Sequence, residues 1–228
     1  MTGTSLQSMS LVSGMGLRAA PSLLRSLGFL SQANLGGRAQ ALLPNLRLLV
    51  DQHHGPQPGL LVQTPLALPS SIDGLPCSPL PLVEGDVPCH PNGVSRCDHI
   101  VLRTPDWATT TAALQELGWE EALVREDVYP GTRLSFFRVG APGRGLALEV
   151  MAPLVPRPHP AQGARVWGVA WVAGGGLEQV AGALTGGLTL SPGKAAVQPR
   201  RRIATLRGDT GGVTMAFLTE RVDTEGAS

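Results

Sequence analysis

The chain has few aromatic residues, few charged residues and no long apolar run. Aromatic residues make up 4% and charged residues 15% of its 228 residues, and the formal net charge is +1. Such a weak net charge gives no long-range attraction to nucleic acid or to an acidic membrane surface. No stretch reaches the roughly 18 consecutive apolar residues that a membrane-spanning helix needs. We therefore expect neither a nucleic acid nor a membrane as a partner.

The remaining composition is typical of a folded protein. Hydrophobic residues account for 43% of the chain and the mean hydropathy is +0.10, which is too apolar for a disordered protein. The length suits one large domain or two small ones. The 29 glycines and 20 prolines predict that some segments are loosely packed.

Cysteine is scarce, and its pattern argues against a disulfide framework and against a structural zinc site. Cys77, Cys89 and Cys97 are odd in number, which argues against a disulfide framework, and they lack the close pairs of a structural zinc site. His90 beside Cys89 and His99 near Cys97 leave a metal site as a minor alternative. The pattern predicts free thiols in a reducing compartment, with the cytoplasm as the default location.

Acidic residues are missing from the first 50 positions, which contain four arginines and several serines. This composition is typical of a transit peptide for a mitochondrion or plastid. A degenerate copy of the repeat described next is the alternative, and the residues alone leave both open.

The middle of the chain has the pattern of a βαβββ unit. An apolar run at 98–102 predicts a strand, and Asp106 is placed to cap a helix over 107–118 that Gly118 ends. Further strands are predicted at 122–126, 133–139 and 146–151.

The same order of elements recurs downstream. The predicted elements are a strand at 166–172, a helix at 176–184, and strands at 202–207 and 213–218. The segments TRLSFFRVGAPGRGLALEVMAPL and RRRIATLRGDTGGVTMAFLTE align as two hairpins with glycine-rich loops. We expect two modules, at 97–155 and 164–220, followed by a tail at 221–228.

A fainter third copy lies near the N-terminus. LRLLVDQHHGPQPGLLVQTPLALP (46–69) aligns with RLSFFRVGAPGRGLALEVMAPLVP, and LLRSLGF (23–29) aligns with ALQELGW. We therefore expect residues 1–66 to form a degenerate βαβββ-like module, with a transit-like or disordered extension as the alternative. Residues 67–96 are rich in proline and lack periodicity, which predicts a linker.

These features together resemble the vicinal oxygen chelate superfamily, which contains glyoxalases, bleomycin-resistance proteins and dioxygenases. The motifs that carry the resemblance are DHIVL with Pro105-Asp106, FFRVG at 136–140 and LEV at 148–150. The resemblance covers residues 97–220, about half of the chain. It implies an α+β fold in which tandem βαβββ modules form a curved mixed sheet around a cleft.

The resemblance also implies a metal site. In the superfamily, the first and fourth strands of the paired modules bind a divalent ion, and His99 and Glu149 map onto two of these positions. The ion would be zinc, nickel, manganese or iron, with Glu149 also catalytic. The second module departs from the pattern, because Gly168 and Ala216 stand at the ligand positions, and the N-terminal copy has Leu61 at the glutamate position. We expect an incomplete metal site.

Basic residues provide candidates for binding an anionic group. They are Arg200, Arg202 and Arg207, and a solvated sheet edge is the alternative role for them.

Aromatic residues provide candidates for the wall of an apolar pocket. Trp167 and Trp171 are expected on a single face of their strand, and Phe136 completes the set. Packing in the core is the alternative role for the tryptophans, and a hydrogen bond between neighbouring strands is the alternative role for His99 and Glu149.

Three functions are consistent with this pattern. The first is a metal-dependent lyase, isomerase, epimerase or dioxygenase-type enzyme acting on a small keto acid, hydroxy acid or thioester. The second is a metal-free module that sequesters a small molecule, and the third is a degenerate relative without activity. The resemblance further implies a homodimer.

Overall fold

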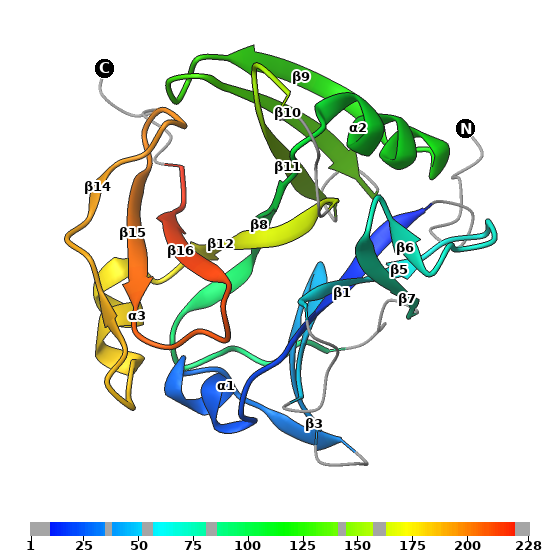
Figure 1. The fold of residues 1–228 in the computed structure, drawn as a ribbon. Helices are drawn as coiled ribbons and strands as arrows, with labels where there is room; N and C mark the ends of the chain where they lie inside the picture. The colour runs from blue at the N-terminus through cyan, green and yellow to red at the C-terminus, as the bar shows by residue number, and fades with distance from the viewer. Residues whose placement is uncertain are drawn as a thin grey trace, which may run out of the picture.

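The computed structural model describes residues 10–34, 38–51, 57–80, 86–140, 145–156 and 163–221. Their strands form a seven-stranded sheet from the N-terminal part of the chain and a nine-stranded sheet from the rest (Figure 1). None of the helices in these ranges is long and apolar enough to cross a membrane.

The nine-stranded sheet consists of two βαβββ modules. The first contains β8 (Val94–Arg103), α2 (Trp107–Glu116), β9 (Glu120–Glu126), β10 (Thr132–Val139) and β11 (Leu146–Pro153). The second contains β12 (Arg165–Ala173), α3 (Leu177–Ala183), β13 (Thr189–Leu190), β14 (Lys194–Ala195), β15 (Arg202–Arg207) and β16 (Thr214–Thr219). In each module the last strand pairs in parallel with the first, and the two first strands, β8 and β12, pair antiparallel at the centre. The predicted α+β fold of tandem βαβββ modules is confirmed.

Local sequence explains where the elements of the first module begin and end. The Asp106 side chain accepts a hydrogen bond from the backbone N–H of Thr109 and caps α2. Gly118 adopts a positive φ of 78° just after the helix, a conformation that glycine tolerates best. In β11 buried and half-buried residues alternate, so one face of this strand contributes to the core and the other is only partly covered.

The seven-stranded sheet begins with the same order of elements. β1 (Leu11–Leu17), α1 (Ser22–Ser26), β2 (Gln32–Asn34), β3 (Arg38–Leu43) and β4 (Leu46–Val50) form a further βαβββ unit, in which β4 pairs in parallel with β1. Three more strands complete the sheet on the other side of β1, namely β5 (Gly59–Gln63), β6 (Ser71–Ile72) and β7 (Leu75–Pro79).

Two expectations for the N-terminal part differ from the structure. The segment 46–69 does not form one hairpin, because β4 and β5 lie on opposite edges of β1. Residues 67–96, predicted as a linker, contain β6, β7 and the start of β8. Because the segment is rich in proline, its sequence does not indicate β7. Leu75 and Cys77 of this strand are buried, and the strand pairs in parallel with β5.

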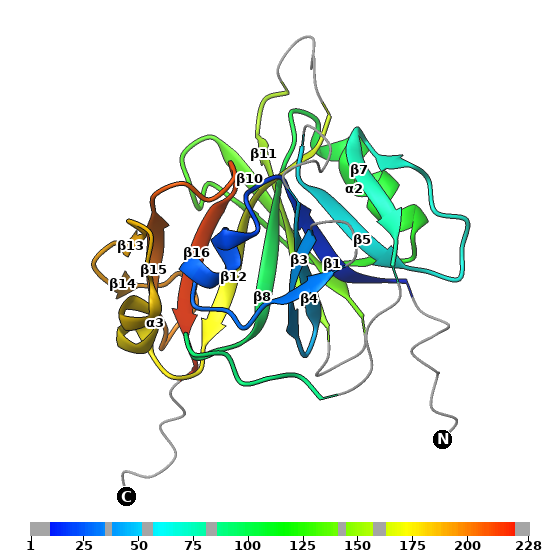
Figure 2. The same cartoon turned by 90° about the horizontal axis from the view of Figure 1, so that it is seen from below.

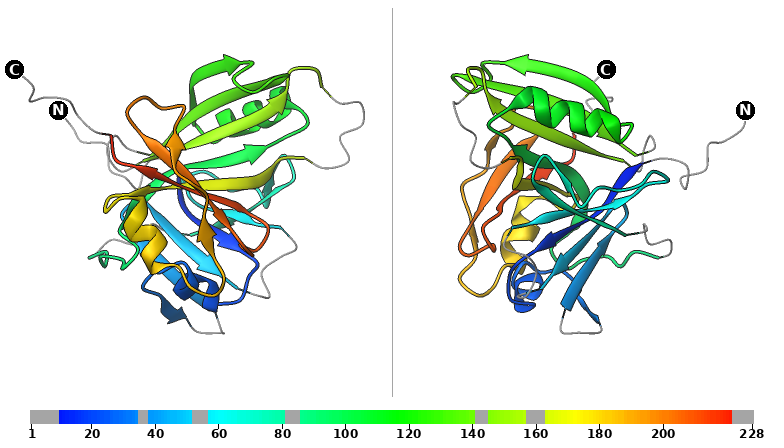
Figure 3. Two further views of the ribbon diagram at one scale, coloured as in Figure 1. Left: turned by 90° about the vertical axis from the view of Figure 1, so that its left-hand side faces the viewer. Right: turned by 45° about the vertical axis from the view of Figure 1, so that its right-hand side comes forward.

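The two sheets lie against each other (Figures 2 and 3) and share one apolar core. The ring of Phe29, which follows α1, packs edge-on against Trp171 of β12, with 5.8 Å between ring centroids. His90, in the segment before β8, is held to the N-terminal part of the chain, since its Nε2 donates to the carbonyl of Leu42 at 2.8 Å and its Nδ1 accepts from the N–H of Leu30. The N-terminal sheet is therefore packed onto the nine-stranded sheet as part of one folded unit.

Candidate functional site

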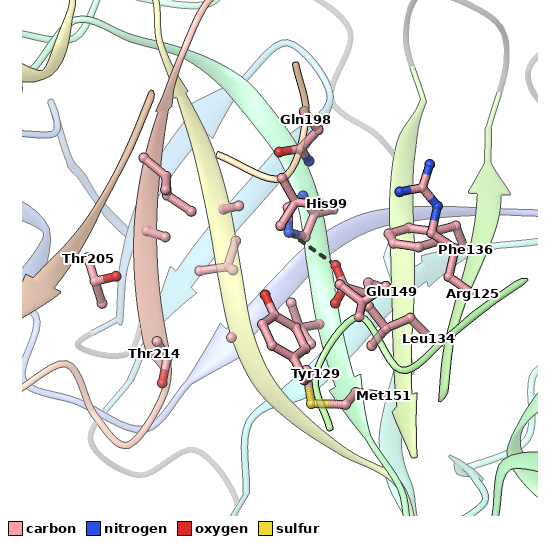
Figure 4. A pocket seen from close by; sticks show the side chains of 18 of the residues that line it. His99, Arg125, Tyr129, Leu134, Phe136, Glu149, Met151, Gln198, Thr205 and Thr214 are labelled. Atoms are coloured by element: carbon pink, nitrogen blue, oxygen red, sulfur yellow. Dashed lines mark ion pairs between the residues drawn. The ribbon is translucent and has the colours of Figure 1, made fainter. Parts of the chain in front are cut away.

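A cleft of about 730 Å³ opens on the nine-stranded sheet (Figure 4). Residues of both modules line it, from β8, β10 and β11 on one side and from β12, β15 and β16 on the other. Most of the lining side chains are apolar, including Val101, Leu134, Phe136, Met151 and Ile203. This composition is typical of a pocket for a small organic molecule.

Four of the predicted site residues line the cleft: His99, Glu149, Trp167 and Phe136. His99 comes from β8 and Glu149 from β11, the first and fourth strands of the first module. Because these strands are neighbours in register, His99 Nε2 and Glu149 Oε2 lie 3.6 Å apart (Figure 4). Each side chain is only 12% exposed.

A chain of polar contacts extends from this pair. His99 Nδ1 lies 2.9 Å from Asp98 Oδ2, and Arg201 Nη1 donates to Asp98 Oδ1 at 2.7 Å. Arg201 Nε also donates to the carbonyl of Thr219. The chain of contacts therefore runs from the guanidinium of Arg201 through the carboxylate of Asp98 and the imidazole of His99 to the carboxyl group of Glu149 in the cleft.

The two acids of this chain have opposite pKa shifts. Burial raises the pKa of Glu149, and the charge of His99 offsets this only in part. Burial also acts to raise the pKa of Asp98, but hydrogen bonds and charge from His99 and Arg201 outweigh it and lower that pKa to about 2. Asp98 is therefore ionised at neutral pH and can only accept hydrogen bonds.

The strand register identifies the positions equivalent to His99 and Glu149 in the second module. In the antiparallel β8–β12 pair, His99 is paired with Ala170 and Gly168 is paired with Val101. Exchanging the two strands therefore puts Gly168 in the place of His99 and Ala170 in the place of Val101. Val101 also pairs with Glu149, and Ala170 pairs with Ala216, so Ala216 is the counterpart of Glu149.

The seven-stranded sheet has no ligand at these positions either. The parallel pair β1–β4 corresponds to the parallel pair β8–β11. Gly14 pairs with Arg47 and Gly16 with Leu49 in the first, and His99 pairs with Ala147 and Val101 with Glu149 in the second. Gly14 and Leu49 thus take the places of the histidine and the glutamate. This corrects the expectation that Leu61 occupies the glutamate position, because Leu61 belongs to β5 on the other edge of β1.

The residues present do not fit the divalent metal that the resemblance implies. In the part of the chain that the structure describes, no group of three or more His, Cys, Asp or Glu side chains could hold a metal ion. His99 and Glu149 contact each other, and Gly168 and Ala216 supply no donor atoms on the opposite wall. Asp98, the carboxylate beside His99, is bound by His99 and Arg201.

Trp171 does not line the cleft, in contrast to the prediction. It is fully buried against Phe29 in the core, while Trp167 lines the cleft. The reason is the irregular register of β12, where Trp167 is an extra residue between the pairs of Val166 and Gly168. A bulge of this kind breaks the alternation of side chains, so residues four apart no longer share a face.

The predicted arginines also lie outside the cleft. Arg200 is an exposed turn residue with a φ of 60°, Arg202 lies near Glu178 on the surface, and Arg207 is exposed. Arg201 instead joins the polar chain, because β15 begins only at Arg202 and the preceding turn reorients its neighbours.

Other cationic residues line the cleft, and no pattern in the sequence indicated them. Arg125, Lys194 and Arg221 are exposed lining residues that make no ion pair with the described acids. They are far apart in the sequence, so no local pattern identifies them.

Comparisons with known proteins found a likeness only among solved structures. No family model matches the chain, and no curated protein matches it. Methylmalonyl-CoA epimerase from Mycobacterium tuberculosis is similar at 20% identity, 56% coverage of this chain and 89% of its own, with a TM-score of 0.43. A Streptomyces coelicolor methylmalonyl-CoA epimerase variant in complex with 2-nitronate-propionyl-CoA shows 20% identity, coverage of 57% and 99%, and a TM-score of 0.43. A hypothetical protein from Bacillus halodurans C-125 shows 15% identity, coverage of 57% and 98%, and a TM-score of 0.43.

Proposed function

We propose that the chain is a vicinal-oxygen-chelate-type protein that binds a small amphipathic organic anion in this cleft without a metal ion. The observation that carries the proposal is the distribution of polarity: most of the lining side chains are apolar, the largely buried His99–Glu149 pair lies among them, and the lining cations are exposed. An apolar body would occupy the cleft and displace water from its walls.

The charges lining the cleft favour an anion. Arg125, Lys194 and Arg221 are cationic, whereas Glu149 is the acidic residue among the lining residues. Because burial raises the pKa of Glu149, its carboxyl group is more easily protonated than an exposed one and can then donate a hydrogen bond to a ligand oxygen. The ligand would therefore place a carboxylate, sulfonate or phosphate near the exposed cations and a neutral oxygen near Glu149.

The binding proposal is tested by calorimetric titration with octanoate and with 1-octanol, which differ mainly in charge. We expect octanoate to bind more tightly, with an advantage that shrinks as salt is added. Removing each of Arg125, Lys194 and Arg221 should weaken octanoate binding by about two- to fivefold and leave octanol binding unchanged. Arg207→Ala, which removes an exposed arginine outside the cleft, is the matched control.

Two results would contradict this proposal. One is the lack of saturable binding by either probe. The other is unchanged binding in Ala216→Trp, a variant in which a large side chain fills the wall of the cleft.

A second candidate function is proton transfer without a metal ion, as in an isomerase or epimerase. The specific observation in its favour is that Glu149, with a raised pKa, lies 3.6 Å from His99 inside an apolar cleft, which suits a general acid and base. In deuterated water the protein should then exchange the α-hydrogen of an acyl thioester or keto acid, and Glu149→Gln should abolish the exchange. Exchange that persists in that variant, or no exchange above background, excludes this candidate.

A further inference from the structure

The polar chain of the cleft depends on an irregularity in β8. His99 pairs with Ala170 and Cys97 pairs with Trp171, so Asp98 is an extra residue without a partner on β12. In a regular strand adjacent side chains point to opposite faces, whereas a bulge brings consecutive residues toward the same side. This explains how Asp98 can contact the imidazole of the residue that follows it, at 2.9 Å.

A residue of the other sheet holds the backbone beside this bulge. Asn45 lies in the turn at residues 44–45, between β3 and β4, and is 5% exposed. Its Nδ2 donates to the carbonyl of Cys97 at 2.8 Å, and its Oδ1 accepts from the N–H of Cys97 at 3.0 Å. The same Nδ2 lies 3.3 Å from the carbonyl of Gly145.

Asn45 occupies a place that a strand would otherwise fill. Along β8, β11 provides pairing partners from His99 onward, and β11 itself begins at Leu146. The side-chain amide of Asn45 supplies a donor and an acceptor to Cys97, as the next residue of a neighbouring strand would. Without it, the N–H and carbonyl of a buried residue next to the bulge would lack partners, which is unfavourable.

The bulge in turn determines which nitrogen of His99 carries the hydrogen. Asp98 is ionised and accepts from Arg201, so its other oxygen can only accept from His99 Nδ1–H. In the neutral imidazole this leaves Nε2 as an acceptor directed at Glu149. A carboxyl group of Glu149 or of a ligand can then donate to it.

We propose that Asn45 is a positioning residue of the cleft: by holding Cys97 it maintains the Asp98 bulge, and the bulge keeps His99 in the Nδ1–H tautomer with Nε2 toward the cleft. The degenerate N-terminal sheet thus has a role in the site of the nine-stranded sheet. The consequence for binding rests on the proposed function, whereas the effect on the tautomer does not.

The test is nitrogen-15 NMR of the histidine side chains in the ligand-free full-length protein at pH 8.5, where imidazole is ordinarily neutral. His99→Gln assigns the signal. Neutral imidazole in water favours the Nε2–H form, so an Nδ1–H signature in the wild type is distinctive. We expect Asn45→Ala to shift His99 toward a mixture of tautomers and to weaken octanoate binding by about three- to tenfold.

Gln32→Ala is the control, because it removes a side-chain amide from the seven-stranded sheet at an exposed position that has no bond to β8 in the described residues. It should leave both the tautomer and the affinity unchanged. Asn45→Asp, which keeps the acceptor for Cys97 N–H but loses the donor, serves if the alanine variant unfolds, and should give the same tautomer change.

An unchanged His99 spectrum in a folded Asn45 variant overturns the proposal, as does an equal change in Gln32→Ala. A wild-type protein that shows the Nδ1–H form but binds neither probe would contradict the proposed function, while the Asn45 variants would still test the positioning role.

Discussion

At the scale of single residues, Glu149 has a position that is unfavourable for the stability of the fold. It lies on a strand whose other residues are mostly apolar, is 12% exposed, and among the described residues its one ion-pair contact is with His99 at 3.6 Å. Burying a carboxylate in this way costs free energy unless it is protonated or well paired. A residue kept under these conditions is a candidate for function.

Replacing Glu149 should stabilise the protein at neutral and alkaline pH. Because its pKa is raised in the folded state, the folded protein binds the proton more tightly than the unfolded chain, and stability falls as the pH rises from the usual glutamate pKa to the raised one. We expect Glu149→Gln to raise the free energy of unfolding at pH 8 by roughly 1 kcal/mol and to have little effect near pH 4. Urea unfolding across this pH range measures it.

Glu116→Gln, on the exposed end of α2, is the control and should leave the free energy of unfolding at pH 8 nearly unchanged. A Glu149 variant less stable than the wild type at pH 8 would mean that its contact with His99 outweighs the cost of burial.

At the scale of secondary structure elements, the same bulge recurs in the first strand of three modules. Asp98 in β8, Trp167 in β12 and Ser13 in β1 are each the extra residue at the register shift. The bulge thus belongs to the module, and the side chain placed there differs: a carboxylate that binds His99, an indole that lines the cleft, and a hydroxyl that donates to the carbonyl of Leu61.

Helix α2 offers a test at this scale, because its start depends on a single capping residue. The Asp106 carboxylate accepts hydrogen bonds from the backbone N–H and the hydroxyl of Thr109. We expect Asp106→Ala to lower the free energy of unfolding by about 1 kcal/mol, as the loss of an N-cap usually does. Chemical unfolding at pH 7 measures this, and Asp106→Asn, which can still cap, should recover most of the loss. Equal losses in both variants would contradict a capping role.

At the scale of the whole molecule, the two sheets depend on each other. His90, in the segment that leads into β8, fixes this segment to the N-terminal part of the chain, since it donates from Nε2 to Leu42 and accepts at Nδ1 from Leu30, while its ring packs edge-on against Phe29. Both ring nitrogens are used in the neutral state, so protonation at Nδ1 would break one of the two hydrogen bonds. Burial accordingly lowers the pKa of His90, and the bond to the Leu42 carbonyl offsets this in part.

Acidification should therefore weaken the contact that His90 makes. With a folded-state pKa below its ordinary value, the contribution of His90 is complete above about pH 6.5 and is lost as the pH falls through the folded pKa. We expect His90→Ala to cost about 2 kcal/mol at pH 7.5, where it leaves the Leu42 carbonyl and Leu30 N–H unsatisfied, and less at pH 5.

Unfolding monitored by tryptophan fluorescence and by far-ultraviolet circular dichroism provides the measurement. Because Trp171 lies in the shared core, the two signals should change at one midpoint. Separate midpoints, or a cost of His90→Ala that does not vary with pH, would contradict this view of the two sheets.

The sequence by itself determined the modules and the first half of the site. Periodicity and turn residues predicted α2, β10, β11, β12 and β15 to within a few residues, because a strand alternates and a helix repeats in ways that local sequence records. The DHIVL and LEV motifs, with the family they resemble, placed His99 and Glu149 together. The loss of ligands at Gly168 and Ala216 could also be predicted, since it needed only the alignment of one module with the other.

Only the tertiary structure decided the rest. The prolines of 67–96 gave no indication of β7 in the sequence. This segment is a strand because it pairs with β5. The bulges moved Trp171 into the core and turned Asp98 toward His99, and no rule of alternation predicts an inserted residue. Arg201, Asn45 and the cations around the cleft are brought together from distant parts of the chain. Their roles follow from contacts between sheets, which local sequence does not encode.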